Sequence, residues 1–428
     1  MSDVKKVKIG DVCTVTKGVT GIQKAIVGRY PMVTLAEERR THNEFQFDCK
    51  AVIVPLVSST GHGHASMKRV HYEEGKFALG SILCAVVPND SNFLNPKYLH
   101  IYLSYLKDKL LVPLMKGAAN VSLSISNIKT VEVVVPPIKR QLEIIELEKL
   151  LFCQNQKLFE QSVLQKSHIA LLRQQILQDA ISGKLTEDWR AEHPDSESAS
   201  ELLKRIKTEK EKLIASKKMK KEKPLPPILE NEILFDLPSS WEWCRLGETG
   251  IAKIGLTYKP SDVVNNGIPV LRSNNIQNGT INYDNLIKVK SCSNEDKMSQ
   301  VGDILICARN GSKHLVGKAA LITKDGMSFG AFMSLFRTKL SYYVYYFLQS
   351  DAFRSQFDDE KSTGINQLTQ GILRNIAIPL PSLAEQIEIV KRIEKLMGYV
   401  SQLEEQVAKN KQSTDMLMQA FLAQSFTN

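Results

Sequence analysis

An internal repeat is the feature that most restricts how this chain can fold. Residues separated by a constant offset of 245 positions (343 − 98, 386 − 141) match without a gap, as Tyr98 and Gln141 match Tyr343 and Gln386. The same offset pairs Leu103 with Leu348, Lys116 with Lys361, Leu123 with Leu368, Pro136 with Pro381, Glu143 with Glu388 and Ile144 with Ile389. A repeat of this period predicts two globular lobes of one design, each followed by the same kind of long helix.

The lobes are predicted to be α/β domains at residues 1–137 and 236–381. Apolar runs that end at proline or turn residues indicate buried strands at 51–57 and 81–87 of the first lobe. A similar buried strand is expected within 301–314 of the second lobe. Helices at 96–111 and 342–357 are expected in equivalent positions, late in each lobe.

Two long helices are predicted, one from Pro136 to about Gly183 and one from Pro381 to about Phe426. Apolar residues recur in both at the heptad spacing by which one helix packs along another. Gly183 is a plausible C-cap. We therefore assign 138–190 and 382–428 as spacer helices that pack on each other. Residues 191–235 are a charged helical connector with a Pro-rich linker, interpreted as a solvated tether with DNA contact as the alternative.

The charge is divided unevenly along the chain, whose formal net charge is +10. The first lobe has 17 Lys and Arg against 11 Asp and Glu, and the second has 16 against 13. Residues 138–203 have 8 against 11, and residues 382–428 have 5 against 6. Basic lobes suit a polyanion such as DNA, whereas the mildly acidic helices do not.

In the first lobe, a polar loop rich in glycine follows the strand at 51–57. Such a loop can approach a phosphate backbone or base edges closely. The candidate DNA contacts here are Arg39, Arg40, Lys68 and Arg69. His62 and His64 are the rival metal site, but they have no acidic or cysteine neighbour, so no metal is predicted.

In the second lobe, arginine, asparagine and glutamine gather beside short strands. Arginine can hold guanine by two hydrogen bonds in the major groove, and asparagine or glutamine can hold adenine. The alternative is that the Asn-Gly pairs only form turns. The candidate DNA contacts are Lys259, Arg272, Ser273, Asn274, Asn275, Gln277, Arg309, Asn310 and Lys313.

Motifs of several enzyme classes are missing from the sequence. It contains no Gly-x-x-x-x-Gly-Lys-Ser/Thr phosphate loop and no His-Glu-x-x-His, and no cofactor or catalytic residue is predicted. The seven cysteines are scattered without a Cys-x-x-Cys, as expected of reduced thiols in the cytoplasm. No apolar run is long enough for a membrane helix, and the start shows no signal peptide.

The order of these parts resembles the specificity subunit of Type I restriction–modification enzymes. The resemblance rests on residues 378–390, which look like the family's join between recognition domain and spacer, and on their weaker twin at 133–145. It also rests on residues 183–190, on the Trp-x-x-x-x-Leu-Gly spacing at 241–247, and on residues 302–312. It extends over essentially the whole chain.

The resemblance implies an α+β fold with two target-recognition lobes joined by an antiparallel coiled coil of two long helices, with pseudo-twofold symmetry. Each lobe would read one half of a split, asymmetric site in double-stranded DNA. Two methyltransferase subunits would dock on the helices and lobes, and restriction subunits would join that complex. S-adenosylmethionine and ATP would belong to those partners.

Three other functions remain open on the sequence alone. The chain could be a stand-alone DNA-binding or targeting module of the same architecture without restriction partners. It could be an enzyme whose carboxylate or histidine set is not recognisable. A pure coiled-coil adaptor is the third, but it does not explain why the positive charge lies on the lobes.

Overall fold

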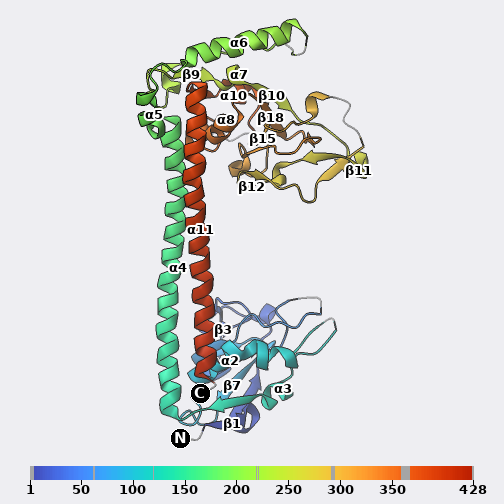
Figure 1. The fold of residues 1–428 in the computed structure, drawn as a ribbon. Helices are drawn as coiled ribbons and strands as arrows, with labels where there is room; N and C mark the ends of the chain where they lie inside the picture. Colours follow the sequence, from blue (N-terminus) through green and yellow to red (C-terminus); the bar gives the residue numbers. More distant parts are fainter. Residues whose placement is uncertain are drawn as a thin grey trace. The chain divides into compact units, whose positions relative to one another are not determined.

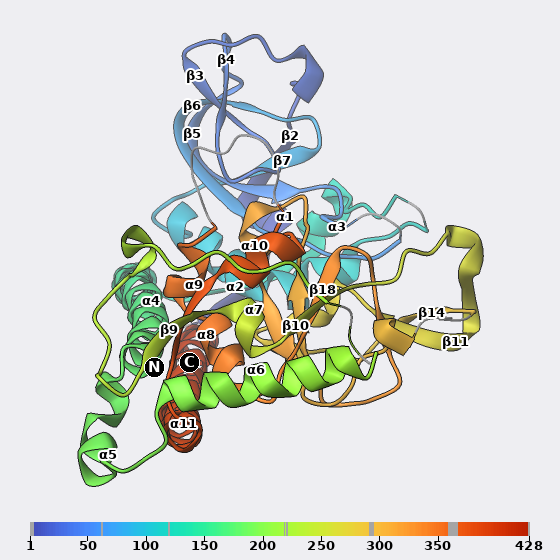
Figure 2. The ribbon, with the colours of Figure 1, turned by 90° about the horizontal axis from the view of Figure 1, so that it is seen from above.

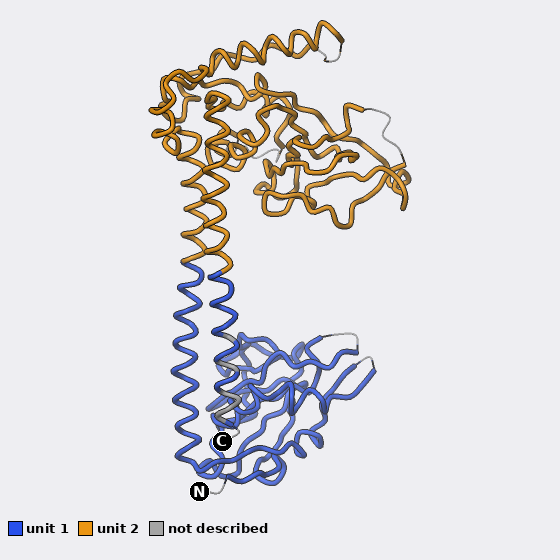
Figure 3. The backbone as a smooth tube through the Cα atoms, in the orientation of Figure 1, with its two compact units in different colours: residues 1–164, 406–428 blue, residues 165–405 orange. Residues whose placement is uncertain are grey.

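The chain divides into two compact units (Figure 3). Unit 1 is Met1–Leu164 with Gln406–Asn428, and unit 2 is Gln165–Glu405. The computed structural model describes residues 4–60, 63–118, 120–217, 219, 221–290, 295–357 and 367–426. Both divisions between the units fall inside long helices, so the domain limits expected at 137/138 and 381/382 stay a prediction. Within the described ranges, no helix has the length and apolar character needed to cross a membrane.

Unit 1 is built on a six-stranded sheet (Figure 1), in which only the β3–β6 pair is parallel. In spatial order its strands are β2 (Cys13–Lys17), β7 (Leu83–Pro88), β5 (Phe47–Pro55), β6 (His71–Leu79), β3 (Tyr30–Val33) and β4 (Arg40–His42). Alternate residues of β5 enter different hydrophobic cores, because successive side chains point to opposite faces of a sheet. Val52 and Val54 join one core, and Ala51 and Ile53 join the other.

The rest of unit 1 forms a helical layer and a small second sheet. Its elements are α1 (Ile9–Val12), α2 (Pro96–Leu110), α3 (Ile125–Thr130) and the antiparallel pair of β1 (Lys5–Lys8) with β8 (Glu132–Val135). Helix α2 starts where expected, because the Asn95 side chain accepts from the Lys97 N–H and Pro96 needs no partner for its nitrogen. Tyr98 and Leu99 are buried in the core beneath it.

Unit 2 repeats this plan with a more divided sheet. A four-stranded sheet has the order β10 (Ile251–Ile254), β18 (Met333–Arg337), β15 (Ile304–Cys307) and β16 (Ala319–Leu321). A three-stranded sheet has the order β14 (Ile287–Val289), β11 (Val263–Leu271) and β17 (Ser328–Phe329), with β11 and β17 parallel. Further elements of this lobe are the hairpin β12 (Ile276–Gln277) with β13 (Thr280–Ile281), the pair β9 (Glu242–Arg245) with β19 (Ala377–Leu380), and the helices α7 (Leu246–Thr249), α8 (Ser341–Leu348), α9 (Asp351–Arg354) and α10 (Gln370–Asn375).

Hydrogen bonds at equivalent positions confirm the internal repeat. The Tyr98 hydroxyl donates to the Val134 carbonyl (2.7 Å), and the Tyr343 hydroxyl donates to the Pro379 carbonyl (2.6 Å). Likewise the Gln141 amide donates to Pro136 O (2.8 Å), and the Gln386 amide donates to Pro381 O (2.9 Å). Each donor and each acceptor in unit 1 is related to its counterpart in unit 2 by the offset of 245. Matching sequence positions therefore form the same hydrogen bonds in both units.

The two long helices are α4 (Ile138–Ile181) and α11 (Leu383–Ser425). Gly183 caps α4 with a φ of 80°, as its sequence position predicts. The helices pair in both units: in unit 2 Arg173 forms an ion pair with Glu404 (2.8 Å), and in unit 1 the Lys411 ammonium lies 5.1 Å from the Phe159 ring centroid. Since α4 runs from unit 1 into unit 2 and α11 returns, they pair antiparallel, which confirms the prediction.

The predicted apolar seam of the helices is only partly covered. Leu177, Ile389, Ile393 and Val400 are almost fully buried. Other seam or neighbouring residues remain between 42% and 70% exposed, namely Leu142, Leu150, Phe152, Leu158, Phe159, Val163, Leu172, Leu403, Leu417 and Phe421. The helices therefore carry more apolar surface than their mutual contact uses.

The connector is not a solvated tether, so that interpretation was wrong for its helical part. After α5 (Glu187–Glu192), helix α6 (Ala199–Ala215) runs beside α7 (Figure 2) and buries Leu202. The Lys210 ammonium donates to the carbonyls of Gly247 (2.6 Å) and Gly250 (2.7 Å). Its burial lowers the pKa of Lys210. The mostly polar sequence of α6 concealed this contact, which combines the Lys210 bonds with burial of Leu202 and an ion pair between Glu209 and Lys339 (2.8 Å).

Candidate nucleic-acid interface

Both units place most of the candidate DNA contacts on two equivalent loops. In unit 1 these loops follow β3 and β5, and in unit 2 they follow β11 and β15. The equivalence is fixed by the backbone, because Gly80 donates to Val33 O (3.0 Å) and Gly330 donates to Leu271 O (2.9 Å). Each bond joins the last residue of the strand before the first loop to the turn before β7 or β18.

In unit 1, Arg39 is already engaged within the protein. Its Nε donates to Glu73 Oε2 (2.6 Å), and its Nη2 donates to Tyr72 O (3.2 Å). A guanidinium with these partners holds the loop after β3 against β6. Arg39 therefore acts first as a support for the loop.

Arg69 and His71 extend this network. Arg69 forms an ion pair with Glu37 (2.8 Å), which ties the two unit 1 loops together. His71 is 5% exposed, and its burial, followed by the charges of Arg39 and Arg69, lowers its pKa to about 4. Neutral His71 thus packs between two arginines without adding positive charge.

Arg40 and Lys68 are the exposed candidates of unit 1. Arg40 lies in β4, and the Lys68 backbone N–H donates to Ser59 Oγ (2.8 Å) while its side chain faces solvent. His64 is exposed and His62 lies outside the described residues. No group of three metal-ligating side chains occurs among the residues that the structure describes.

In unit 2, Asn275 has a structural role that the sequence did not reveal. It is 3% exposed, its Oδ1 accepts from the Arg272 N–H (2.9 Å), and its Nδ2 donates to Asn282 O (3.1 Å). Because both ends of this amide are used, Asn275 shapes the loop and we remove it from the proposed base contacts. Arg272 Nε, in contrast, is buried without a hydrogen-bond partner among the described residues.

Side-chain amides connect the two loops of unit 2. Asn310 Nδ2 donates to Ser273 Oγ (3.3 Å), and Asn310 Oδ1 accepts from the Ser312 N–H (3.0 Å). The structure therefore brings Ser273 and Asn310 together, as a shared site requires. Lys259 lies outside these contacts, exposed in the turn before β11.

The remaining candidates of unit 2 are exposed around this connection. They are Asn274, Gln277, Arg309 and Lys313. Gln277 Nε2 donates to Asn274 O (3.3 Å) at the base of the β12–β13 hairpin. Asn278 and Gly279 have φ angles of 50° and 76°, so this Asn-Gly pair forms a turn, as the alternative interpretation predicted.

Sequence reasoning missed Phe332, which lies just before β18 at the same place. Its side chain is 62% exposed, and the Arg309 guanidinium carbon is 5.6 Å from its ring centroid. Aligning the segment Gly330–Met333 with Gly80–Leu83 of unit 1 would have placed Phe332 in the turn beside these loops.

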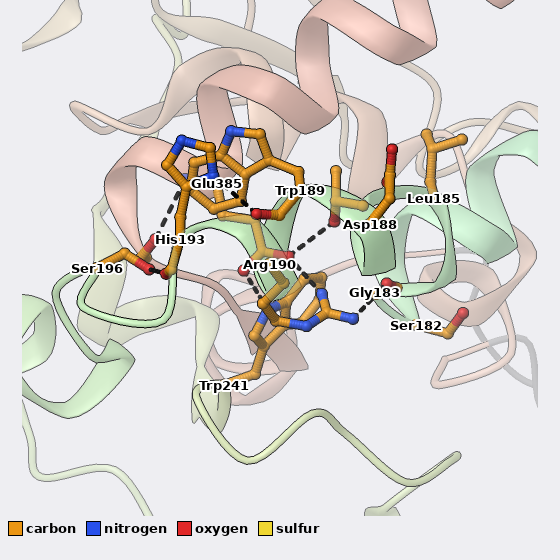
Figure 4. Close-up of polar contacts among 12 residues, drawn as sticks. Ser182, Gly183, Leu185, Asp188, Trp189, Arg190, His193, Ser196, Trp241 and Glu385 are labelled. Atoms are coloured by element: carbon orange, nitrogen blue, oxygen red, sulfur yellow. Dashed lines mark hydrogen bonds and ion pairs between the residues drawn. The ribbon is translucent and has the colours of Figure 1, made fainter.

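The sequence motifs at 183–190 and 241–247 form a joint rather than part of the interface (Figure 4). Glu385 in the first turn of α11 is 1% exposed and accepts from three sides. Its donors are the Thr186 hydroxyl (2.7 Å), the Trp241 indole N–H (2.8 Å) and the Arg190 guanidinium. Arg190 also donates to Gly183 O (2.8 Å), so the end of α4, the start of α11 and the start of the second lobe meet at one carboxylate.

Comparison with known proteins identifies the family. The sequence model of the Type I restriction modification DNA specificity domain matches residues 1–150 and 238–411, which is more than half of the chain. The chain belongs to this family. The two matched segments contain the two loop pairs described above, so each loop pair lies in one copy of the specificity domain.

Curated relatives in the specificity family resemble parts or all of the chain. The Type I restriction enzyme EcoAI specificity subunit of Escherichia coli is 30% identical over 257 residues, 58% of this chain and 43% of the relative. The EcoDI specificity subunit of Escherichia coli is 25% identical over 433 residues, 99% of this chain and 88% of the relative. The match thus covers less than half the length of EcoAI but most of EcoDI.

Solved structures share the fold. One is a chain from a study of complex assembly and conformational transition of the type I R-M system, with a TM-score of 0.65, 16% identity, and 99% and 97% of the two chains covered. Another is the HsdS subunit from Thermoanaerobacter tengcongensis, with a TM-score of 0.54, 16% identity, and 99% and 96% covered. At this identity the likeness supports the specificity-subunit fold alone.

Proposed function

We propose that this chain is the DNA-recognition subunit of a Type I restriction–modification complex, in which each unit reads one half of a split site. The observation that carries the proposal is the repeated pair of loops, held by the same backbone bonds but carrying different polar side chains. A shared framework with different side chains suits two half-sites of different sequence. The basic charge of both lobes supports a DNA partner.

The proposed contacts fall into two kinds. Exposed cations at the loops, such as Arg40 and Lys68 in unit 1, suit phosphates and set the position of the DNA. Arg272 and Arg309 in unit 2 carry guanidinium groups of the kind that holds guanine in the major groove, whereas the Asn310 amide is used at both ends, by Ser273 and Ser312, to connect the loops. This division assigns sequence reading in unit 2 to the connected loops.

Catalysis is assigned to partner subunits in this proposal. The exposed apolar residues of α4 and α11 support docking of methyltransferase subunits, since a stripe of that kind is unfavourable in water. We propose two such subunits, with restriction subunits joining the same complex. S-adenosylmethionine and ATP would be bound by those partners.

Methylome sequencing of cells with and without the gene tests the proposal. We expect a split motif with methylated adenines that disappears on deletion and returns with the wild-type gene. The Arg272→Ala variant should lower methylation at the intact motif, whereas Arg140→Ala, on the exposed start of α4, should not.

The outcome against the proposal is equally definite. An unchanged methylome on deletion, in cells whose methyltransferase genes are active, would contradict it. Specific DNA binding by the chain in that case would support a stand-alone binding module instead.

A further inference from the structure

Phe332 is a protruding aromatic at the centre of the unit 2 loops. It belongs to the segment Gly330–Met333, which passes between the loops after β11 and β15. A Cβ added to Gly330 would lie 3.8 Å from Arg272 Cγ, which places this segment beside Arg272. On the other side lies Arg309, whose guanidinium carbon is 5.6 Å from the Phe332 ring centroid.

The backbone holds Phe332 in this position. Its carbonyl accepts from the backbone N–H groups of Ala308 (2.9 Å) and Arg309 (3.0 Å). These bonds do not involve the side chain, so they remain when the ring is replaced. Phe332 is therefore 62% exposed at a position that the backbone fixes.

Unit 1 has a different residue at the equivalent position. Leu56 donates to Ile82 O (2.9 Å) as Ala308 donates to Phe332 O, so Ile82 is the counterpart. Ile82 is half-buried and packs against a core of unit 1. Of the two equivalent positions, the one in unit 2 projects an aromatic ring, which gives the two units different reading surfaces.

The surroundings of Phe332 favour one kind of contact with DNA. In the major groove the apolar feature of a base pair is the 5-methyl group of thymine, and arginine beside it reads guanine. Insertion of the ring between base pairs needs both ring faces. Arg309 already covers one face, which leaves the edge and the other face for a methyl group.

We propose that Phe332 reads a thymine in the half-site of unit 2 by packing against its 5-methyl group, with Arg309 on the adjacent base pair. This inference rests on the proposed function and deepens it, since it names the base chemistry of one contact. In this proposal Phe332 determines specificity in unit 2. The equivalent residue of unit 1, Ile82, is aliphatic and half-buried.

The test uses the full chain in complex with its methyltransferase subunits and a duplex carrying the methylated motif. Each thymine of the unit 2 half-site is replaced in turn by deoxyuridine, which lacks only the methyl group. One replacement should weaken wild-type binding about 3- to 5-fold, the effect of losing one buried methyl. The same replacement should have no effect on the Phe332→Ala variant, and Phe332→Leu should retain part of it.

Phe45→Ala is the matched control. Phe45 is also exposed (43%) with a cation on its ring, as Lys76 Nζ lies 5.0 Å from its centroid. It precedes β5, at the end of that strand opposite the loop that carries Lys68. Phe45→Ala should keep both the affinity and the deoxyuridine effect.

Three results would overturn the inference. One is a deoxyuridine effect that persists in Phe332→Ala, and another is a half-site in which no thymine responds in the wild type. The third is increased fluorescence of 2-aminopurine placed beside the contact, because that signal indicates an unstacked base step. All three presuppose specific binding by the wild-type complex, whereas loss of specific binding altogether would contradict the proposed function itself.

Discussion

In unit 1 the first turn of α4 presents Arg140 to solvent, whereas in unit 2 the equivalent position in α11 is the buried Glu385. The Arg140 side chain is 45% exposed and pairs with Glu143 on its own helix (3.1 Å). The Glu385 side chain is 1% exposed and has three donors from distant parts of the chain. One repeated design therefore carries an ordinary helix start in one copy and a buried ionic joint in the other.

The loops differ in the same way. Unit 1 holds its loops with ion pairs, through Arg39 with Glu73 and Arg69 with Glu37. In unit 2 the neutral Asn310–Ser273 bond joins the two loops, and Asn275 and the Arg354 guanidinium, which donates to His314 O and Val316 O, support them. The difference shows that the hydrogen-bonded framework is the repeated part, while the loops and joints vary on it.

The largest expected difference between the units comes from Glu385→Ala. Removing this carboxylate leaves the Arg190 guanidinium and the Trp241 N–H without their acceptor, which should lower the free energy of unfolding of unit 2 by about 3–5 kcal/mol. Arg140→Ala, at the matching position, should change unit 1 by no more than about 0.5 kcal/mol. All three tryptophans lie in unit 2, so tryptophan fluorescence during urea unfolding reports on unit 2, and hydrogen exchange of β5 reports on unit 1.

Glu385→Gln is the intermediate variant of this experiment. It keeps an acceptor but introduces an amide NH₂ among three donors, and its effect should lie between wild type and alanine. Equal losses from Glu385→Ala and Arg140→Ala would break the comparison, because the joint would then add nothing to unit 2.

The second largest expected difference between the units is the loss of stability in acid. Burial lowers the pKa of His71 and of His100 to about 4 from 6.5. Between pH 4 and pH 6.5 the unfolded state therefore binds more protons than the folded state. The stability of unit 1 is complete above about pH 6.5 and falls as the pH is lowered towards 4. Each histidine should cost unit 1 about 2 kcal/mol by pH 5.

Hydrogen exchange provides the readout for this pH effect. Protection of β5 and β6 in unit 1 should fall between pH 7 and pH 5, after correction for the intrinsic rate. Protection of β15 should change less, since the histidines of unit 2 are all exposed. His71→Gln should flatten the slope in unit 1, and an unchanged slope would exclude His71 as its source.

The smallest expected effect distinguishes residues that contact bases from residues that stabilise the loops. Arg272→Ala should weaken binding to the cognate half-site by about 1–3 kcal/mol and binding to unrelated DNA by much less. Arg39→Ala should instead lower the stability of unit 1, because its guanidinium is occupied by Glu73 and Tyr72. Competition binding with cognate and unrelated duplexes measures the first effect, and equal loss on both would make Arg272 a phosphate contact.

The parts of the fold that depend on local pattern were predictable. Helix α4 begins two residues after Pro136 and is capped by Gly183, and α11 begins two residues after Pro381. Proline and glycine act on the backbone within a few residues, so their positions show in the sequence. The framework of both units was predictable for a similar reason, because the repeat duplicates it.

The parts that depend on long-range contact were not predictable. Glu385 meets Thr186 and Trp241 across 199 and 144 residues of sequence, and nothing near Glu385 indicates either partner. Asn275 resembled a base contact until its burial was visible. The docking of α6 through Lys210 was hidden because a lysine usually signals solvent, and here its two acceptors are backbone carbonyls.

Phe426 gives unit 1 an unusual order of assembly on the ribosome. Its ring packs 5.1 Å from Tyr102 and 6.1 Å from Tyr98, centroid to centroid, inside the core of unit 1. Phe426 is synthesised more than 300 residues after Tyr98, which takes on the order of half a minute at typical translation rates. During that time the nascent first lobe lacks the Phe426 ring, so the aromatic site beside Tyr98 and Tyr102 stays open. Premature termination would therefore leave a hydrophobic surface on the first lobe, where chaperones and proteases can recognise an unfinished product.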